Sequence, residues 1–228
     1  MGADKTYPKG ESGKPMALEA RGVTQDGRRF SPSVARNRDV LRDTFLKWVG
    51  DRAYVLEIAS GTGEHGAHIV SSAPHIRWAY SDIEAANFES QLAWAAFNQT
   101  DQLEGPYLVD AGVAHWGDAE TRGPYDAIVA TNMIHIAPFA AAEGLFAGAG
   151  RLLAPDGVLL LYGPFAQDGD IAPSNAAFDA NLKQRDARWG VRDLTRQIVP
   201  LAKANGLKLA HLEDMPANNL SVVFRREA

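Results

Sequence analysis

A buried strand that runs directly into a glycine-rich turn is the feature that most constrains this chain. Residues 53–59 are almost entirely apolar, and Gly61, Gly63 and Gly66 follow, after which polar and apolar residues alternate through Ser72. A short apolar run of this kind is typical of a strand buried on both faces, and the glycines have the spacing G-x-G-x-x-G. The segment therefore predicts a strand, a tight turn and a helix N-terminus that a ligand can approach closely.

The same alternation of strand and helix patterns continues along the chain. We expect helices at about 31–49, 84–98, 140–153, 174–186 and 193–204, and strands at 53–59, 76–81, 105–109, 126–132, 158–162, 207–213 and 220–225. Strands that alternate with helices predict an α/β fold with a Rossmann-like, doubly wound and mostly parallel sheet. The last two strands are joined by a loop too short for a parallel crossover, so they predict a C-terminal antiparallel hairpin.

The chain has 228 residues, which favours one domain. Residues 1–29 contain glycine, proline and both signs of charge without periodicity, and we expect them to form an N-terminal arm that is partly disordered or acts as a lid. Residues 30–228 are then a single domain, with a helical insertion at about 164–192.

Composition excludes several classes of function. Acidic residues number 28 against 23 basic ones, the formal net charge is -5, and no run of lysine and arginine occurs, so we expect no nucleic-acid partner. The absence of cysteine excludes disulfides, zinc–thiolate sites and a thiolate nucleophile. The N-terminus lacks the apolar stretch of a signal peptide, so we expect a cytoplasmic protein without a membrane partner. A monomer and a homodimer both remain open.

Carboxylates follow or end three successive predicted strands, and they indicate which ligand the turn binds. Glu57 precedes the glycine turn, where a carboxylate would sit poorly beside a pyrophosphate but suits a cationic amino-acid group. Asp82 lies about twenty residues after Gly61, the position at which an acid accepts hydrogen bonds from ribose hydroxyls. Asp110 is placed to accept from an adenine amine. S-adenosylmethionine fits this set because it carries an ammonium, a sulfonium and no phosphate.

Residues 55–63 resemble the first motif of class I S-adenosylmethionine-dependent methyltransferases, and the Pro155-Asp156-Gly157 turn and the terminal hairpin support this over about residues 31–226. Five segments further resemble the methyltransferase-like 26 family, formerly a domain of unknown function: residues 31–37, 132–136, 163–165, 189–193 and 218–225. The resemblance implies in-line transfer of a methyl group from S-adenosyl-L-methionine to a small-molecule acceptor. It also implies a set of cofactor-binding residues, namely Glu57, Ala59, Gly61, Gly63, Asp82, Asp110 and Asn132. Ala59 departs from the class pattern, which usually has glycine there.

The acceptor is expected near the end of the fourth strand of the sheet, where His135 is a candidate general base. The other candidate substrate residues are Arg36, Asn37, Trp116, Met133, Trp189 and Arg192. We expect no metal, because His65 and His68 lack a third ligand nearby. Two alternatives stay open, an NAD-dependent oxidoreductase, which the glycine spacing permits, and a non-catalytic adaptor that keeps the fold and binds the cofactor.

Overall fold

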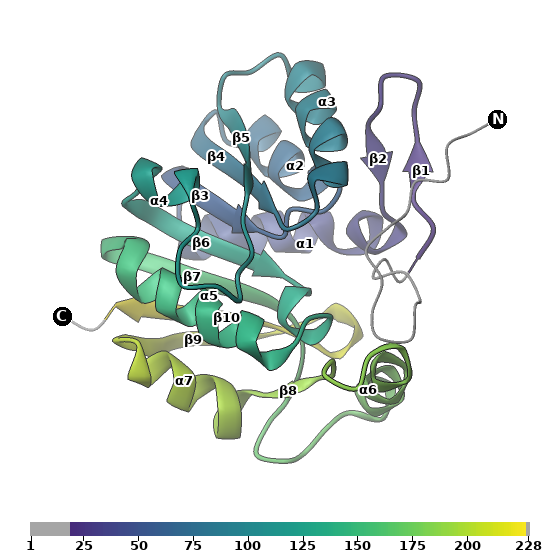
Figure 1. Ribbon diagram of the computed structural model, residues 1–228, viewed down its shortest axis with the longest axis vertical. Coiled ribbons are helices and arrows are strands. Elements are labelled where there is room, and N and C mark those ends of the chain that lie inside the picture. Colours follow the sequence, from purple (N-terminus) through teal and green to yellow (C-terminus); the bar gives the residue numbers. More distant parts are fainter. Residues whose placement is uncertain (1–18, 227–228) are drawn as a thin grey trace.

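The computed structural model describes residues 19–226, which form one large twisted sheet with helices on both faces and a separate two-stranded sheet (Figure 1). The strands are β1 (Gly22–Val23), β2 (Arg29–Phe30), β3 (Arg52–Ile58), β4 (His75–Asp82), β5 (Leu103–Leu108), β6 (Tyr125–Thr131), β7 (Leu153–Ala166), β8 (Arg192–Asp193), β9 (Leu207–Met215) and β10 (Asn219–Arg226). The α-helices are α1 (Pro32–Trp48), α2 (Glu64–Ser72), α3 (Phe88–Asn98), α4 (Asp118–Arg122), α5 (Phe139–Leu152), α6 (Pro173–Arg185) and α7 (Val199–Ala204). Short 3-10 turns cover Ala85–Asn87, Met133–His135 and Pro216–Asn218, and a π-helical turn covers Leu194–Ile198.

The sheet has the strand order β5-β4-β3-β6-β7-β10-β9. The strands from β5 to β7 are parallel, whereas β10 is antiparallel to both β7 and β9. This confirms the predicted α/β class, with a doubly wound, mostly parallel sheet and a terminal hairpin. The strand order reverses between β3 and β6, and in such sheets ligands bind where the strands end at this switch point. We call the side of the sheet where the parallel strands end the carboxyl edge.

Each central strand contributes to two hydrophobic clusters, because successive side chains point to opposite faces of the sheet. In β3, Val55 belongs to the cluster under α1 and α2, while Leu56 belongs to the cluster under α5 and α7. Leu41 and Phe45 bury the apolar stripe of α1 in the first of these clusters. Apolar side chains therefore pack on both faces of the sheet, and polar side chains lie at its carboxyl edge.

The predicted N-terminal arm lies partly outside the described residues, which begin at 19. Within it, β1 and β2 pair antiparallel and lie beside α3. The Arg29 amide donates to Ser90 Oγ at 2.8 Å, and Trp94 Nε1 donates to the Arg29 carbonyl at 3.2 Å. Residues 22–30 thus have regular structure, while a lid role for the arm stays a prediction.

Two predicted elements differ in detail from the structure. The 155–157 turn lies within β7, since Tyr125 and Ala127 of β6 pair with Leu153 and Val158, and the intervening residues form a bulge. The helix expected at 193–204 is a π-helical turn followed by α7. Pro200 lies in the first turn of α7 and has no amide proton to continue an α-helical ladder through this point.

Candidate functional site

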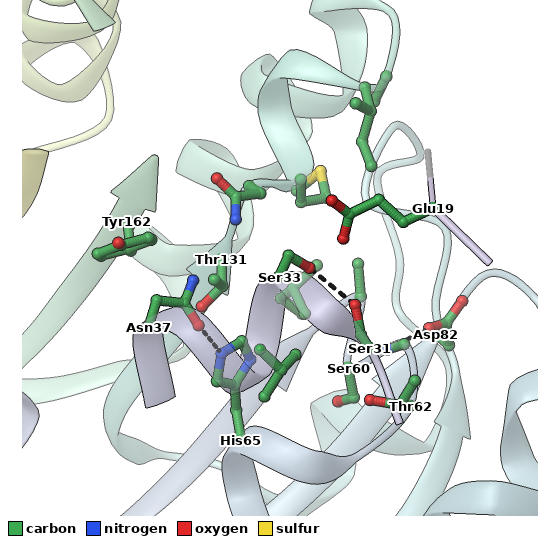
Figure 2. A pocket seen from close by; sticks show the side chains of 18 of the residues that line it. Glu19, Ser31, Ser33, Asn37, Ser60, Thr62, His65, Asp82, Thr131 and Tyr162 are labelled. Carbon is green, nitrogen blue, oxygen red and sulfur yellow. Dashed lines mark hydrogen bonds between the residues drawn. The ribbon is translucent and has the colours of Figure 1, made fainter. Parts of the chain in front are cut away.

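A cavity of about 930 Å³ extends along the carboxyl edge, from the end of β5 to the start of β10 (Figure 2). Side chains from α1 and α6 and from Glu19 and Arg21 also line it. Eight of the predicted site residues line this cavity: Arg36, Asn37, Ala59, Gly61, Asp82, Asp110, Asn132 and Met133. Six others are outside its lining: Glu57, Gly63, Trp116, His135, Trp189 and Arg192.

Asp82 ends β4 and is the best anchored of the acidic residues in the lining. Its Oδ2 accepts the Gly61 amide at 2.8 Å, and its Oδ1 accepts the Glu84 amide at 2.9 Å. The residue is 4% exposed, and burial raises the pKa of its carboxyl although these amides oppose the rise. The Asn87 side chain also hydrogen-bonds this carboxylate, so Asp82 presents its remaining acceptor capacity to the cavity in a fixed orientation.

The turn after β3 adopts left-handed backbone angles that bring its peptides to the cavity. Ala59 has φ 59° and Gly61 has φ 56°, and both line the cavity. Glycine reaches this region at little cost, whereas alanine does so at a cost of about 1–2 kcal/mol. Ala59 therefore keeps the backbone shape at a position where the methyltransferase resemblance expects glycine.

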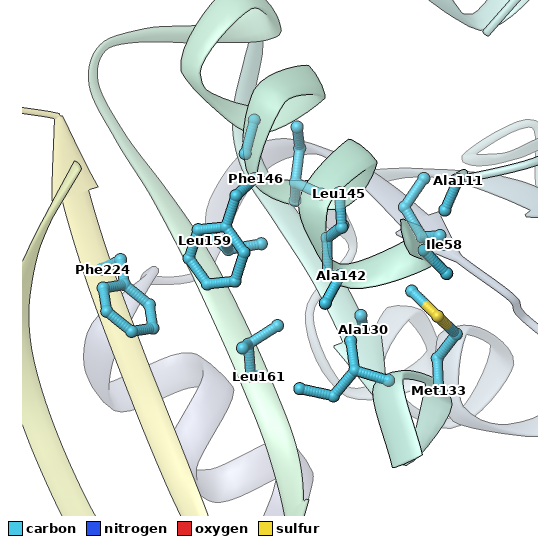
Figure 3. Packing of buried hydrophobic residues seen from close by; sticks show 14 of the residues in the cluster. Ile58, Ala111, Ala130, Met133, Ala142, Leu145, Phe146, Leu159, Leu161 and Phe224 are labelled. Atoms are coloured by element: carbon cyan, nitrogen blue, oxygen red, sulfur yellow. The ribbon is translucent and has the colours of Figure 1, made fainter. Parts of the chain in front are cut away.

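Apolar side chains form the wall beside the two acidic residues. Ile83 is 48% exposed and follows Asp82 directly, and Val109 and Ala111 flank Asp110 after β5. Figure 3 shows that part of this surface, including Ala111 and Met133, is the end of the hydrophobic core under α5. The cavity thus offers apolar surface next to two carboxylates.

Glu57 points to the same face of β3 as Val55, the face that α1 and α2 cover, and away from the face of Leu56 and Ile58. Its Oε2 accepts a hydrogen bond from Trp78 Nε1 at 3.0 Å, and the residue is 2% exposed. Burial raises the pKa of Glu57 to about 7. This placement corrects the expectation that Glu57 faces the ligand, because in the strand pleat it points toward the cluster under α2.

The Glu57→Gln variant tests this burial. Unfolded Glu57 ionises near pH 4.5 and folded Glu57 near pH 7, so the folded state binds the extra proton between these values and loses stability as pH rises. The wild-type free energy of unfolding should fall by about 3 kcal/mol through Glu57 across this range. Glutamine can still accept from Trp78 and removes this dependence, so the variant should be the more stable protein at pH 8.

Urea unfolding at pH 5, 6, 7 and 8 measures the effect. Glu143→Gln, at an exposed position on α5, is the control and should keep the wild-type slope. If the free energies of unfolding of wild type and Glu57→Gln change with pH in the same way, burial does not raise the pKa of Glu57.

His135 is buried behind the lining and does not reach the cavity. It is 1% exposed, its ring packs edge-on to Phe165 with centroids 5.0 Å apart, and neither ring nitrogen has a hydrogen-bond partner among the described residues. Burial first, and the nearby Arg192 charge second, lower the pKa of His135 to about 3. The geometry therefore does not support the predicted general base.

Three predicted substrate residues have structural contacts instead. Trp116 is 1% exposed and packs so closely on α5 that a Cβ at Gly148 would lie 2.2 Å from its ring. Arg192 donates to the carbonyls of Ile134 and Ala137 and so braces the turn after β6, while Trp189 is 2% exposed. Burial of large aromatic area accounts for both tryptophans.

The cavity also contains a set of neutral polar residues that the sequence did not single out together. We call them the polar chain: His65, Asn37, Tyr162 and Asn219, all of which line the cavity. His65 Nε2 lies 2.9 Å from Asn37 Oδ1, and Asn219 Nδ2 donates to Tyr162 Oη at 3.3 Å. In Figure 2, Tyr162, Asn37 and His65 lie on the side of the cavity away from Asp82. Asn37 and Asn219 lie in two of the segments that carried the family resemblance. The signal for His65 and Tyr162 was only that their elements begin or end at the carboxyl edge.

The N-terminus of α2 is covered by protein. Glu64, its first residue, is 2% exposed, and its carboxylate accepts from the Ser31 amide at 3.2 Å and pairs with Arg38 at 3.1 Å. Ser90 Oγ of α3 donates to the Thr62 carbonyl at 2.7 Å. A phosphate group at this helix N-terminus would therefore lie next to the buried Glu64 carboxylate, although Gly61, Thr62 and His65 around it line the cavity.

Residues 19–226 contain no group of three or more histidine, aspartate and glutamate side chains that could hold a metal ion. Within the same residues, no helix has both the length and the apolar character needed to cross a bilayer.

Comparison with known proteins assigns the family. A family model described as Protein of unknown function (DUF938) matches residues 28–226, which is most of the chain. The chain belongs to the DUF938 family. The family description gives no activity, and the resemblance to the methyltransferase-like 26 family stays a prediction.

Solved structures place this DUF938 protein within a known fold. An O-methyltransferase family protein from Burkholderia thailandensis is 16% identical with a TM-score of 0.68, covering 85% of this chain and 60% of its own. Human N-acetylserotonin methyltransferase, solved with SAM, is 12% identical with a TM-score of 0.67, covering 86% and 53%. The PH0226 protein from Pyrococcus horikoshii is 15% identical with a TM-score of 0.65, covering 86% and 92%.

At these identities the likeness shows the fold alone, which is that of S-adenosylmethionine-dependent methyltransferases. The DUF938 chain spans between about half and two thirds of the length of the two named methyltransferases. Four of the five segments that carried the family resemblance contribute to the cavity lining, and residues 189–193 do not.

Proposed function

We propose that this DUF938 protein is an S-adenosylmethionine-dependent methyltransferase with a small-molecule acceptor. The observation that carries the proposal is Asp82, whose carboxylate is fixed by the Gly61 and Glu84 amides at the lip of a cavity on the switch point. This is the position at which related folds bind the ribose of a nucleoside cofactor. The fold of the solved methyltransferases supports the same conclusion.

The residues present fit this cofactor. The acceptor capacity that Asp82 retains suits ribose hydroxyls, and Asp110 suits an adenine amine next to the apolar surface of Ile83. Thr131 Oγ1, at the end of β6, is buried in the lining without a hydrogen-bond partner among the described residues. A buried hydroxyl of this kind is satisfied when a polar ligand group binds, and it suits the amino-acid end of the cofactor.

The same geometry disfavours the NAD alternative. A dinucleotide places its pyrophosphate on the helix N-terminus that follows the glycine turn. Here Glu64 carries a buried carboxylate at that point, and Ser90 closes the turn from the side of α3. S-adenosylmethionine has no phosphate and does not need this N-terminus. Glu57 is outside the cavity lining and does not discriminate between the two cofactors.

The bound cofactor would supply an electrophilic methyl group on a sulfonium. The chain would contribute orientation, since Asp82 and Asp110 fix the nucleoside and the opposite wall holds the acceptor. α1 and α6 line the cavity on its outer side and so help to exclude water. The cavity volume of about 930 Å³ suits a cofactor together with a small acceptor.

Calorimetric titration tests the proposal directly. We expect S-adenosylmethionine and S-adenosylhomocysteine to bind at one site with micromolar affinity and NAD to give no heat. Binding of NAD without either methyl-cofactor ligand would overturn the proposal. Cofactor binding without methyl transfer to any compound of a small-molecule extract would favour the adaptor alternative.

A further inference from the structure

The polar chain lies on the side of the cavity away from Asp82 (Figure 2). Tyr162 is the last residue of β7 that pairs with β6, and it lies at the carboxyl edge. Asn219 is the first residue of β10, which is antiparallel to β7 and so starts at the same edge. Asn219 Nδ2 donates to the Pro216 carbonyl at 2.9 Å and to Tyr162 Oη at 3.3 Å. Because a carbonyl oxygen only accepts, the Pro216 contact fixes the orientation of the Asn219 amide. Tyr162 Oη is therefore the acceptor in its bond with Asn219.

The other end of the polar chain approaches the same tyrosine. His65 Nε2 bonds to Asn37 Oδ1 at 2.9 Å, so the ring carries its proton on Nε2. Burial lowers the pKa of His65 to about 4, which leaves the ring neutral at pH 7. The Asn37 amide nitrogen is left for Tyr162, and hydrogen bonds from Asn37 and Asn219 oppose the rise in the Tyr162 pKa that burial causes.

The hydroxyl proton of Tyr162 is not used in the hydrogen bonds of the polar chain. Both asparagines donate to the phenol oxygen, so its O–H is directed away from them. Tyr162 is 2% exposed and lines the cavity, and the hydrogen bonds that its hydroxyl makes to described residues are those from the two asparagines. A buried O–H in a ligand cavity calls for an acceptor on the ligand.

The charged and basic side chains around Tyr162 bear on the charge and the protonation of the methyl acceptor. The cavity lining from α1, α6, β7 and β10 includes the guanidinium groups of Arg36 and Arg185, and these four elements contribute no carboxylate. Arg36 pairs at 2.7 Å with Glu19, which also lines the cavity, and Arg185 Nε donates to Asn181 Oδ1 at 3.3 Å. His65 already uses Nε2 within the polar chain, and His135 lies outside the lining. Among the described residues of this wall, His65 Nδ1 is the ring nitrogen that could accept a proton, and burial lowers the pKa of His65 to about 4, so the ring is a weak base. A nucleophile that has no proton to lose therefore suits this wall better than one that needs a general base.

We propose that Tyr162 holds the methyl acceptor through its hydroxyl, and that the acceptor is a small carboxylic acid bound as the carboxylate and converted to its methyl ester. This inference rests on the proposed function. One carboxylate oxygen attacks the methyl carbon, the carbon–sulfur bond breaks, and sulfur keeps the electron pair. A carboxylate and a sulfonium become a neutral ester and a neutral thioether, and no proton is released. The other carboxylate oxygen accepts from Tyr162.

The first test uses the stability of the product. The protein is incubated with methyl-labelled S-adenosylmethionine and the small-molecule fraction of a cell extract, and the products are treated with mild alkali. Methyl esters hydrolyse and release labelled methanol as a vapour, whereas methyl ethers, amines and thioethers keep the label. We expect most of the transferred label to be released as methanol.

The second test removes the hydroxyl alone. In Tyr162→Phe we expect the rate of labelling at low extract concentration to fall 10- to 100-fold, the loss typical of one hydrogen bond to a charged group, with unchanged affinity for S-adenosylhomocysteine. Tyr125→Phe is the matched control, because Tyr125 is a buried tyrosine on β6 whose hydroxyl donates to the Ala119 carbonyl outside the cavity lining. Its labelling rate should stay within about twofold of wild type.

The outcomes separate this inference from the proposed function. Label that resists alkali, or a Tyr162→Phe variant as active as Tyr125→Phe, overturns the carboxylate acceptor and leaves the methyltransferase standing. Absence of transfer together with absence of S-adenosylhomocysteine binding overturns both.

Discussion

Replacing Asp82 by alanine is expected to weaken binding of S-adenosylhomocysteine at least about 100-fold. The carboxylate is placed to accept two ribose hydroxyls, and each charged hydrogen bond contributes about 1.5–3 kcal/mol. The substitution also removes the acceptor that holds the Gly61 amide at 2.8 Å, so the glycine turn keeps only its Ser60–Ser81 hydrogen bonds to the end of β4. Asp82→Asn keeps one carbonyl acceptor and should lose about tenfold. Calorimetric titration of the folded variants measures both.

Asp126→Ala is the matched control for this prediction. Asp126 also accepts a backbone amide, that of Tyr54 at 2.8 Å, but it lies near the start of β6 and therefore at the opposite end of the parallel strands. Its removal should lower stability slightly and leave cofactor affinity unchanged. Equal affinity in Asp82→Ala and Asp126→Ala would refute the assignment of Asp82 to the ribose.

The fold was predictable because its signals are local and repeated. Apolar runs of strand length alternate with helical patterns from α1 to β7, and this order permits few sheets other than a parallel doubly wound one. The short link between β9 and β10 determined the antiparallel hairpin in the same way. The π-helical turn at Leu194–Ile198 was not predictable, because its residues read as ordinary helix until the effect of Pro200 is considered.

The site was predictable only in part, since sequence position gives the end of a strand but not the face to which a side chain points. Asp82 and Asp110 come to the cavity lining, whereas Glu57 turns toward Trp78 on the covered face of β3. Tyr162 was overlooked within an apolar strand. The polar chain joins α1, α2, β7 and β10, and contacts between such distant segments have no local signal.

Gly66→Ala is expected to have the second large effect, a loss of stability, because Gly66 packs against side chains that support the glycine turn. A Cβ at Gly66 would lie 2.4 Å from Trp78 Nε1 and 2.8 Å from Tyr80 Cε1, distances that real Cβ contacts do not reach. Trp78 is fully buried and donates to Glu57, and the Tyr80 hydroxyl donates to the Gly63 carbonyl at 2.8 Å. The added methyl group must therefore displace side chains that support the glycine turn.

Overpacking of this kind costs about 1–3 kcal/mol, and loss of the hydrogen bond to a buried carboxyl group adds to it. We expect the free energy of unfolding of Gly66→Ala to fall by about 3 kcal/mol and Tm by roughly 6–12 °C. Gly22→Ala is the control, because its new Cβ would approach no atom closer than 3.9 Å and its φ is not in the left-handed region. Thermal unfolding followed by circular dichroism compares the two. A Tm for Gly66→Ala within about 2 °C of the control would mean that α2 can move away from β4 at little cost, and that the glycine is not needed for close packing.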